Sequence, residues 1–101
     1  MTENNLANAY SDRIRGDPAE NIEQAIKHYR QALKVYTEKD FPEDWARTEN
    51  NLANAYRGRI RGDRAENIEQ AIEHYSLSLK IYTPKGFPNR CRGTSYRLGN
   101  L

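Results

Sequence analysis

The stretch Glu3 to Tyr10 reads Glu-Asn-Asn-Leu-Ala-Asn-Ala-Tyr, and the same residues recur in the same order at Glu49 to Tyr56. Sliding the chain by 46 positions also superimposes Arg13–Asp17 on Arg59–Asp63, and about 30 of 44 aligned positions are identical. A unit repeated in tandem at this period predicts a solenoid, in which each copy buries its apolar side against the next copy. Such stacks present extended surfaces, so the repeat points to binding rather than to a reaction.

Composition sets the limits of this interpretation. A chain of 101 residues forms one domain at most, and 37% hydrophobic residues with a mean hydropathy of −1.04 are few for a single compact core, although stacked helices tolerate that. Sixteen basic and fourteen acidic residues give a formal charge of +2 and a pI near 8.8, which argues against nucleic acid as the partner.

The cysteine count and the hydropathy pattern bear on location. Cys91 is the only cysteine, so neither a disulfide nor a cysteine metal site can form within one chain. The sequence shows no signal peptide and no long apolar run. We therefore expect no membrane association and a reducing, cytoplasmic setting.

Each repeat contains two helical patterns, of which the second is the clearer. Its apolar residues fall at helical spacing and form one stripe that should face neighbouring helices. The stripe consists of Ile22, Ala25, Ile26, Tyr29, Leu33 and Tyr36, and it recurs as Ile68, Ala71, Ile72, Tyr75, Leu79 and Tyr82.

Helix starts are marked by capping residues. Asp17 should cap the second helix, with Pro18 at its first position and Glu20 completing a capping box, and Asp63 repeats the device. A glycine precedes each cap, where the preceding helix would need a left-handed end; these are Gly16 and Gly62.

The first helix of a complete repeat should open at Phe41-Pro42. Its buried face should consist of Trp45, Leu52, Ala53, Tyr56 and Ile60. The chain then divides into a partial repeat at 1–40, a complete repeat at 41–86 and a partial repeat at 87–101. Apolar residues on the end helices, among them Leu6 and Leu98, predict either a piece of a longer array or end-to-end stacking of copies.

The repeat resembles the tetratricopeptide repeat. Leu52, Ala53 and Tyr56 match the first-helix signature of that family, and Ala71 and Tyr75 match the second. The earlier copy carries the same matches at Leu6, Ala7, Tyr10, Ala25, Tyr29 and Ala32. The resemblance implies an all-α fold of antiparallel helical hairpins stacked in a right-handed solenoid, with the first helices lining a concave face. Each unit here is roughly 12 residues longer than the family's 34, and the additions fall at helix ends, as longer helices or as larger turns.

A narrower resemblance concerns the phrases Phe41 to Tyr56 and Arg59 to Ile72. They are similar to bacterial, especially cyanobacterial, tandem arrays that are often fused to a caspase-like CHAT protease domain. That resemblance would make this chain the sensor or scaffold part of such a protein.

The first helices carry a row of asparagines. Asparagine is a mediocre helix former, so its repeated occurrence within a helix suggests a specific role. The row consists of Asn4, Asn5, Asn8, Asn50, Asn51, Asn54 and Asn100. A carboxamide can pair with the backbone of an extended peptide, and the resemblance implies that Asn8, Asn54 and Asn100 contact the main chain of a ligand. The alternative is that the asparagines bond between helices or face water, and Asn5 and Asn51 are the pair for which we expect that structural role.

Arginines form the second group of candidates. They gather around the central turn as Arg57, Arg59, Arg61 and Arg64 and on the last helix as Arg90, Arg92 and Arg97. Local ion pairs and solubility are the main explanation, and contact with an acidic partner, above all by Arg57 and Arg97, is the alternative. The lysines of the tetratricopeptide carboxylate clamp are missing.

No catalytic constellation, phosphate loop or cofactor motif is visible, so we expect no enzyme, no cofactor and no metal site. His28 and His74 occupy equivalent places on separate helices, which does not suit one shared metal. The sequence thus predicts a scaffold that binds a peptide or protein segment on the concave face. Two alternatives stay open: a structural segment that assembles with itself, and a weak binder of single-stranded RNA.

Overall fold

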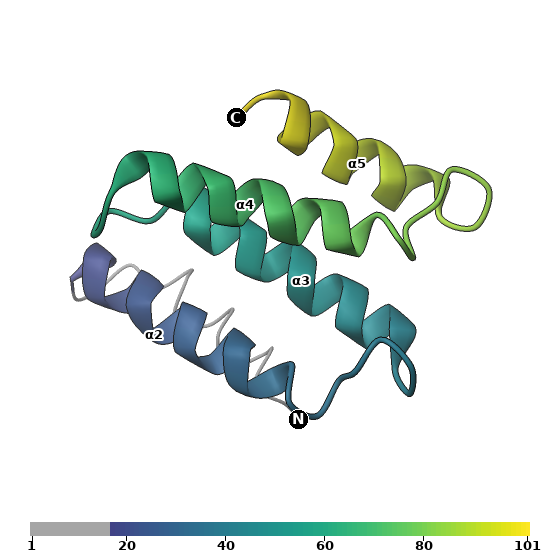
Figure 1. Cartoon of the computed structure of the whole chain (residues 1–101), viewed down its shortest axis with the longest axis horizontal. Helices are drawn as coiled ribbons and strands as arrows, with labels where there is room; N and C mark the ends of the chain where they lie inside the picture. Colours follow the sequence, from purple (N-terminus) through teal and green to yellow (C-terminus); the bar gives the residue numbers. More distant parts are fainter. Residues whose placement is uncertain (1–16) are drawn as a thin grey trace.

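The computed structural model describes residues 17–101 and forms four α-helices in that range, with no strand there. The helices are α2 (Pro18–Ala32), α3 (Pro42–Arg57), α4 (Arg64–Ser78) and α5 (Pro88–Gly99). Successive helices run in opposite directions (Figure 1). The predicted all-α helical-repeat class is therefore confirmed. Residues 58–63 and 79–87 lie outside the helices, so the additional residues of each repeat form larger turns.

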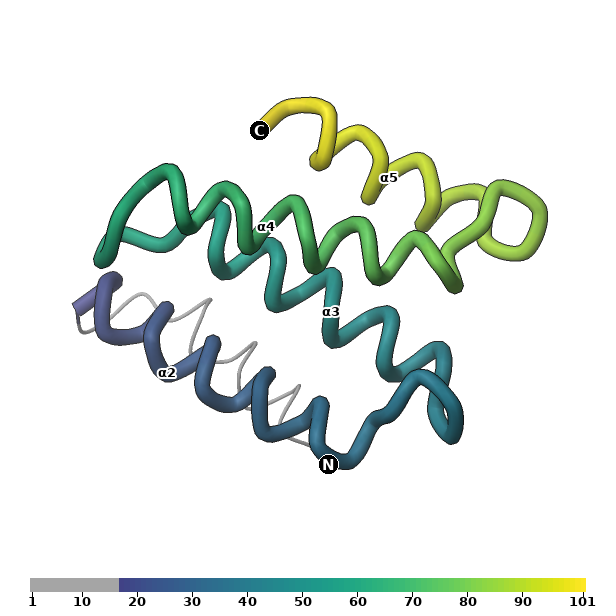
Figure 2. Tube along the Cα trace, viewed as in Figure 1, coloured from purple at the N-terminus to yellow at the C-terminus, as the bar shows by residue number. Residues whose placement is uncertain are grey.

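The helices stack in the order of the sequence. α3 packs against α2 on one side and against α4 on the other, and α5 packs against α4 (Figure 2). The contact between α3 and α4, the two helices of the complete repeat, is the most extensive of the three. This arrangement brings the same face of successive repeats onto one side of the molecule.

Helix starts follow the predicted signals. The Asp17 side chain accepts a hydrogen bond of 3.0 Å from the Ala19 amide, and Asp63 accepts one of 3.1 Å from the Glu66 amide. Prolines occupy the first turns of α2, α3 and α5. The capping box predicted for Glu20 is wrong, because the Glu20 carboxylate accepts from Gln24 and Arg61 instead.

The end of α3 differs from the prediction. The helix stops at Arg57, with Gly58 as its cap at φ −92°, so Ile60 falls in the connection and is 63% exposed rather than buried. Gly62 does adopt the left-handed conformation, at φ +84°, but it lies directly before the cap of α4 and not at the end of α3. The prediction for Gly16 lies outside the described residues.

Small side chains let the helices approach closely in the core. Ala25, Ala53 and Ala71 are fully buried, and they cluster with Leu52 and Tyr75. A second cluster surrounds Trp45 and includes Ala46 and Tyr82. The apolar stripes predicted for the second helices are therefore largely buried. Ile72 is an exception, since 42% of it is exposed, whereas its repeat equivalent Ile26 is 8% exposed.

One pair of ionisable side chains lies inside this core. Nδ1 of His74 on α4 is 3.0 Å from Oε1 of Glu49 on α3, and the imidazole stacks on the Tyr56 ring at 5.8 Å. Within residues 17–101 there is no group of three His, Cys, Asp or Glu side chains that could hold a metal ion. In the same range, none of the helices has the length and apolar character needed to cross a bilayer.

Candidate functional site

A pocket of about 250 Å³ opens between the first helices α3 and α5. It is lined by Asn50 of α3, Tyr82 of the connection, and the α5 residues Asn89, Arg90, Gly93, Thr94 and Arg97. The α5 residues 90, 93, 94 and 97 follow helical spacing and so share one face of that helix. We call this site the inner groove.

A hydrogen bond between the two helices sets the floor of the inner groove. The hydroxyl of Thr94, which is only 2% exposed, donates to Asn50 Oδ1 at 3.0 Å. Asn50 is thereby held in place, and its amide nitrogen donates to no group in the part of the chain that the structure describes. A fixed carboxamide with an available donor can bond to a ligand carbonyl.

A second set of side chains meets at the Tyr75 hydroxyl, which donates to Asn54 Oδ1. Burial raises the pKa of Tyr75 above its usual value, and the guanidinium groups of Arg57 and Arg97 oppose the rise. Asn54, Arg57 and Arg97, three residues that the sequence singled out, are therefore gathered around one hydroxyl beside the inner groove.

Positive charge dominates the groove. The Arg90 guanidinium lies 5.6 Å from the centre of the Tyr82 ring. Burial raises the pKa of Tyr82, and the charges of Arg90 and Arg47 oppose that rise. Among the described residues, neither Arg90 nor Arg97 has a carboxylate partner within ion-pair distance, whereas Arg47 pairs with Asp44. Two guanidinium groups thus remain available to a ligand.

The remaining asparagines of the row differ in position and in hydrogen bonding. Asn100 lies exposed at the end of α5 and donates to the Tyr96 carbonyl at 2.7 Å. Asn51 is half-buried and has no hydrogen bond of its side chain within residues 17–101. Bonds between helices are made by Asn50 and Asn54. Three predicted residues, Asn4, Asn5 and Asn8, lie outside the described residues.

Sequence reasoning singled out Arg90 and Arg97 among the arginines of the last helix, but it missed Asn89, Gly93 and Thr94 of the groove lining. Asn89, Arg90 and Gly93 replace Glu43, Asp44 and Arg47 of the preceding copy, so they do not belong to the repeated pattern. The available signal was the spacing of Arg90, Thr94 and Arg97 along one helical face.

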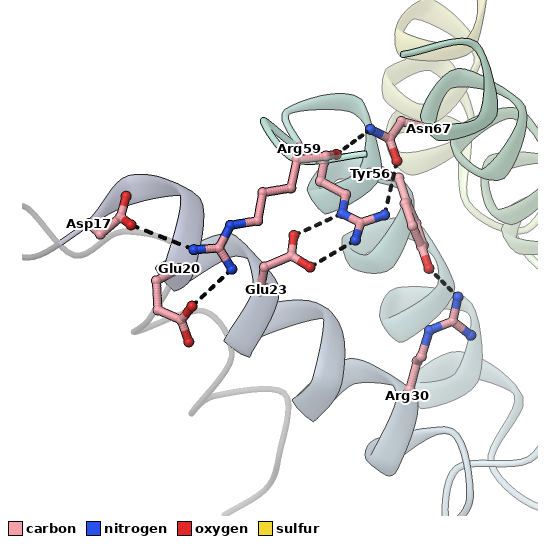
Figure 3. A network of polar contacts seen from close by, with 8 residues as sticks. Asp17, Glu20, Glu23, Arg30, Tyr56, Arg59 and Asn67 are labelled. Atoms are coloured by element: carbon pink, nitrogen blue, oxygen red, sulfur yellow. Dashed lines mark hydrogen bonds and ion pairs between the residues drawn. The ribbon is translucent and has the colours of Figure 1, made fainter. Parts of the chain in front are cut away.

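Other arginines serve the junction between repeats (Figure 3). Arg59 contacts Glu23 through two nitrogen–oxygen pairs, each of 2.8 Å, and its bonds hold the pKa of Glu23 below the usual range. Arg61 lies 3.0 Å from Glu20 and 3.7 Å from Asp17. The local ion pairs considered for these two arginines are therefore present.

The same network borders a second pocket, of about 390 Å³. Its lining includes Arg30, Tyr56, Arg59 and Asn67, where Arg30 donates to the Tyr56 hydroxyl and Arg59 donates to Asn67 at 3.2 Å. Since these polar groups already bond to one another, this pocket offers a ligand less than the inner groove does.

Comparison with known proteins identifies a family for the chain. Residues 1–90 match the family model described as soluble NSF attachment protein, SNAP. No curated protein matches the chain, and no solved structure matches it either. The family is one of helical-repeat proteins that act as scaffolds for protein interactions rather than as enzymes. With most of its length covered by that model, the chain belongs to the soluble NSF attachment protein (SNAP) family.

Proposed function

We propose that the chain binds an acidic, extended segment of a partner protein in the inner groove. The observation that carries the proposal is the pair Arg90 and Arg97, which line one pocket and have no carboxylate partner among residues 17–101. A guanidinium group binds a carboxylate with two charge-assisted hydrogen bonds, which gives both attraction and orientation. Asn50, and Asn54 beside it, would bond to the ligand main chain.

The spacing of the two arginines suggests a ligand pattern. Seven residues of helix separate them by about 10 Å along the axis. A polyproline-type segment advances about 9 Å in three residues and returns to the same side. Acidic residues at positions i and i+3 of an extended peptide would therefore reach both guanidinium groups.

Family membership supports the class of ligand. The family is described as soluble NSF attachment protein, and helical repeats of this type bind protein partners. For this chain, family membership supports a protein segment as the ligand. The acidic character of that segment is inferred from the arginines of the inner groove. The cytoplasmic location and the narrower resemblance to CHAT-associated arrays stay predictions.

Fluorescence anisotropy with two labelled peptides tests the proposal. One peptide carries glutamates at i and i+3, and the other carries lysines at the same places. We expect binding of the acidic peptide only, and a loss of tenfold or more in affinity for R90E/R97E, because two attractive contacts become repulsive (about 1.4 kcal/mol per tenfold). Equal binding of both peptides would count against the groove.

A matched control separates local contact from net charge. R64E/K85E makes the same change in net charge at two exposed positions that do not line the inner groove. We expect it to retain nearly the full affinity at physiological salt, where charges beyond about 8 Å are screened. If the control lowers affinity as much as R90E/R97E does, the attraction is not specific to the groove.

The single-stranded RNA hypothesis can be tested in the same assay. Arginines also bind phosphate, so a labelled single strand is titrated beside the acidic peptide. Tighter binding of the strand at physiological salt would replace the peptide as the proposed ligand.

A further inference from the structure

The carboxamides of the inner groove share one arrangement of hydrogen bonds. Thr94 donates to Oδ1 of Asn50 at 3.0 Å, and Arg92 donates to Oδ1 of Asn89 at 2.9 Å. Beside the groove, Oδ1 of Asn54 is held in the same way by a tyrosine hydroxyl. Each amide oxygen is thus occupied by a donor of the protein, and within residues 17–101 none of the three amide nitrogens donates to another group.

The groups that remain for a ligand are therefore hydrogen-bond donors. An amide nitrogen and a guanidinium group donate and do not accept. The arginines of the groove, Arg90 and Arg97, add further donors, and none of the described residues that line the groove carries a carboxylate. A ligand satisfies such a surface with oxygen atoms, from carboxylates and from main-chain carbonyls.

The main chain of most peptides also carries an N–H group in each residue. Against a surface of donors, that N–H would lose its bond to water without gaining an acceptor, which lowers affinity. Proline has no N–H and keeps its carbonyl, so it avoids this loss. Proline also favours the polyproline-type helix, both in itself and in the residue before it. That helix is the conformation in which acidic residues at i and i+3 would reach both arginines.

Gly93 leaves room for such residues between the two arginines. It follows Arg90 by three positions and precedes Arg97 by four, so it lies on the same face of α5. Beyond the neighbouring helix backbone, a Cβ added at Gly93 would meet no described atom within 4 Å, so the space above it is open. Tyr96, which neighbours Gly93 on the helix surface, is 72% exposed and offers an aromatic ring. Proline-rich segments pack on aromatic side chains of this kind.

We propose, on the basis of the proposed function, that the partner segment carries prolines between its two acidic residues, in the pattern Glu-Pro-Pro-Glu. The inner groove recognises this segment through oxygen atoms alone. The two glutamates bind Arg90 and Arg97, and the prolines lie over Gly93. Their carbonyls accept from the amide nitrogens that the protein leaves unused, among them that of Asn50.

Fluorescence anisotropy with two labelled peptides tests the ligand pattern. The peptides differ only in the two residues between the glutamates, which are proline in one and alanine in the other. We expect the proline peptide to bind at least about threefold more tightly, because its conformation is preformed and fewer N–H groups are left without an acceptor. Equal or weaker binding of the proline peptide would overturn the inference.

The alanine peptide separates this inference from the proposed function. If the alanine peptide binds, R90E/R97E weakens that binding and proline brings no gain, the proposed function stands and the proline pattern is wrong. If neither peptide binds, both are wrong.

A leucine at position 93 tests where the prolines lie. G93L should lower the affinity for the proline peptide by about tenfold or more, because the new side chain occupies the space above the helix. The helix should be retained, since leucine is a better helix former than glycine. Circular dichroism and thermal unfolding measure this.

The matched control is G99L. It adds the same side chain to the same helix outside the groove lining, at a position where a Cβ likewise meets no described atom within 4 Å. G99L should bind the proline peptide like wild type. Binding of G93L at wild-type affinity, or equal losses in the two variants, would overturn the placement of the prolines over Gly93.

Discussion

His74 on α4 and Glu49 on α3 form a pair inside the helical core, with Nδ1 and Oε1 3.0 Å apart and both residues less than 10% exposed. We predict that E49A lowers the free energy of unfolding by about 2–4 kcal/mol, because it leaves a buried imidazole without its partner. Urea unfolding followed by the fluorescence of Trp45, the only tryptophan, measures the loss.

A double substitution is the control for this pair. E49L/H74F replaces both partners by apolar groups, so no polar group is left without a bond and the stability should exceed that of E49A. A double variant that is less stable than E49A would contradict this, because it would mean that the pair contributes more to stability than the hydrogen bond that each partner supplies to the other.

Asn54 should have a structural role besides any ligand contact. The Tyr75 hydroxyl donates to Asn54 Oδ1, so N54A and Y75F should each lower the free energy of unfolding, by about 1 kcal/mol for the hydrogen bond. A double-mutant cycle measures the coupling between them. If the two effects simply add, the contact contributes nothing to stability.

Acid should weaken the repeat junction. Hydrogen bonds from Arg59 lower the pKa of Glu23 in the folded state from its ordinary value of 4.5. A group with a lowered folded pKa stabilises the fold above its unfolded pKa, and this contribution is lost as the pH falls through the folded pKa. Stability should therefore decline below about pH 4.5. E23Q should cost about 1 kcal/mol at neutral pH and flatten this decline. An unchanged acid profile in E23Q would contradict the assignment.

Gly62 and Gly58 form a matched pair of glycines in one connection. Gly62 has φ +84°, and a Cβ there would lie 3.3 Å from an Arg59 guanidinium nitrogen, so G62A should cost about 1 kcal/mol or more. G58A should cost less, because Gly58 has φ −92° and the nearest atom to its Cβ is 3.7 Å away. Thermal unfolding of both variants checks the order, and equal losses would contradict it.

The sequence was sufficient to predict most of the fold, because the repeat, the caps and the apolar stripes agree with one another. Asp17, Asp63 and Pro42 stand at helix starts as expected. The errors arose where the pattern was extended too far. Ile60 keeps the apolar spacing of α3 although the helix has already ended, and Ile72 keeps that of α4 although part of it stays uncovered.

Contacts between side chains of different helices, in the core and in the inner groove, were harder to predict from sequence. Glu49 and His74 are polar, and helical spacing alone does not reveal that two polar residues from different helices meet in a core. Asn89 and Gly93 of the groove depart from the repeat, so comparison of the two copies drew attention to what is shared and away from these two residues. Pairing across helices depends on their packing, which single-helix periodicity does not encode.

The unequal packing of α3 against its two neighbours has a mechanical consequence. Because α3 contacts α4 more extensively than α2, the hairpin of one repeat should stay stiff while the boundary between repeats yields. Part of that boundary is held by half-buried ions. In a longer row of such units, the curvature of the solenoid should depend on ionic strength, because dissolved salt screens the ion pairs at each boundary between repeats.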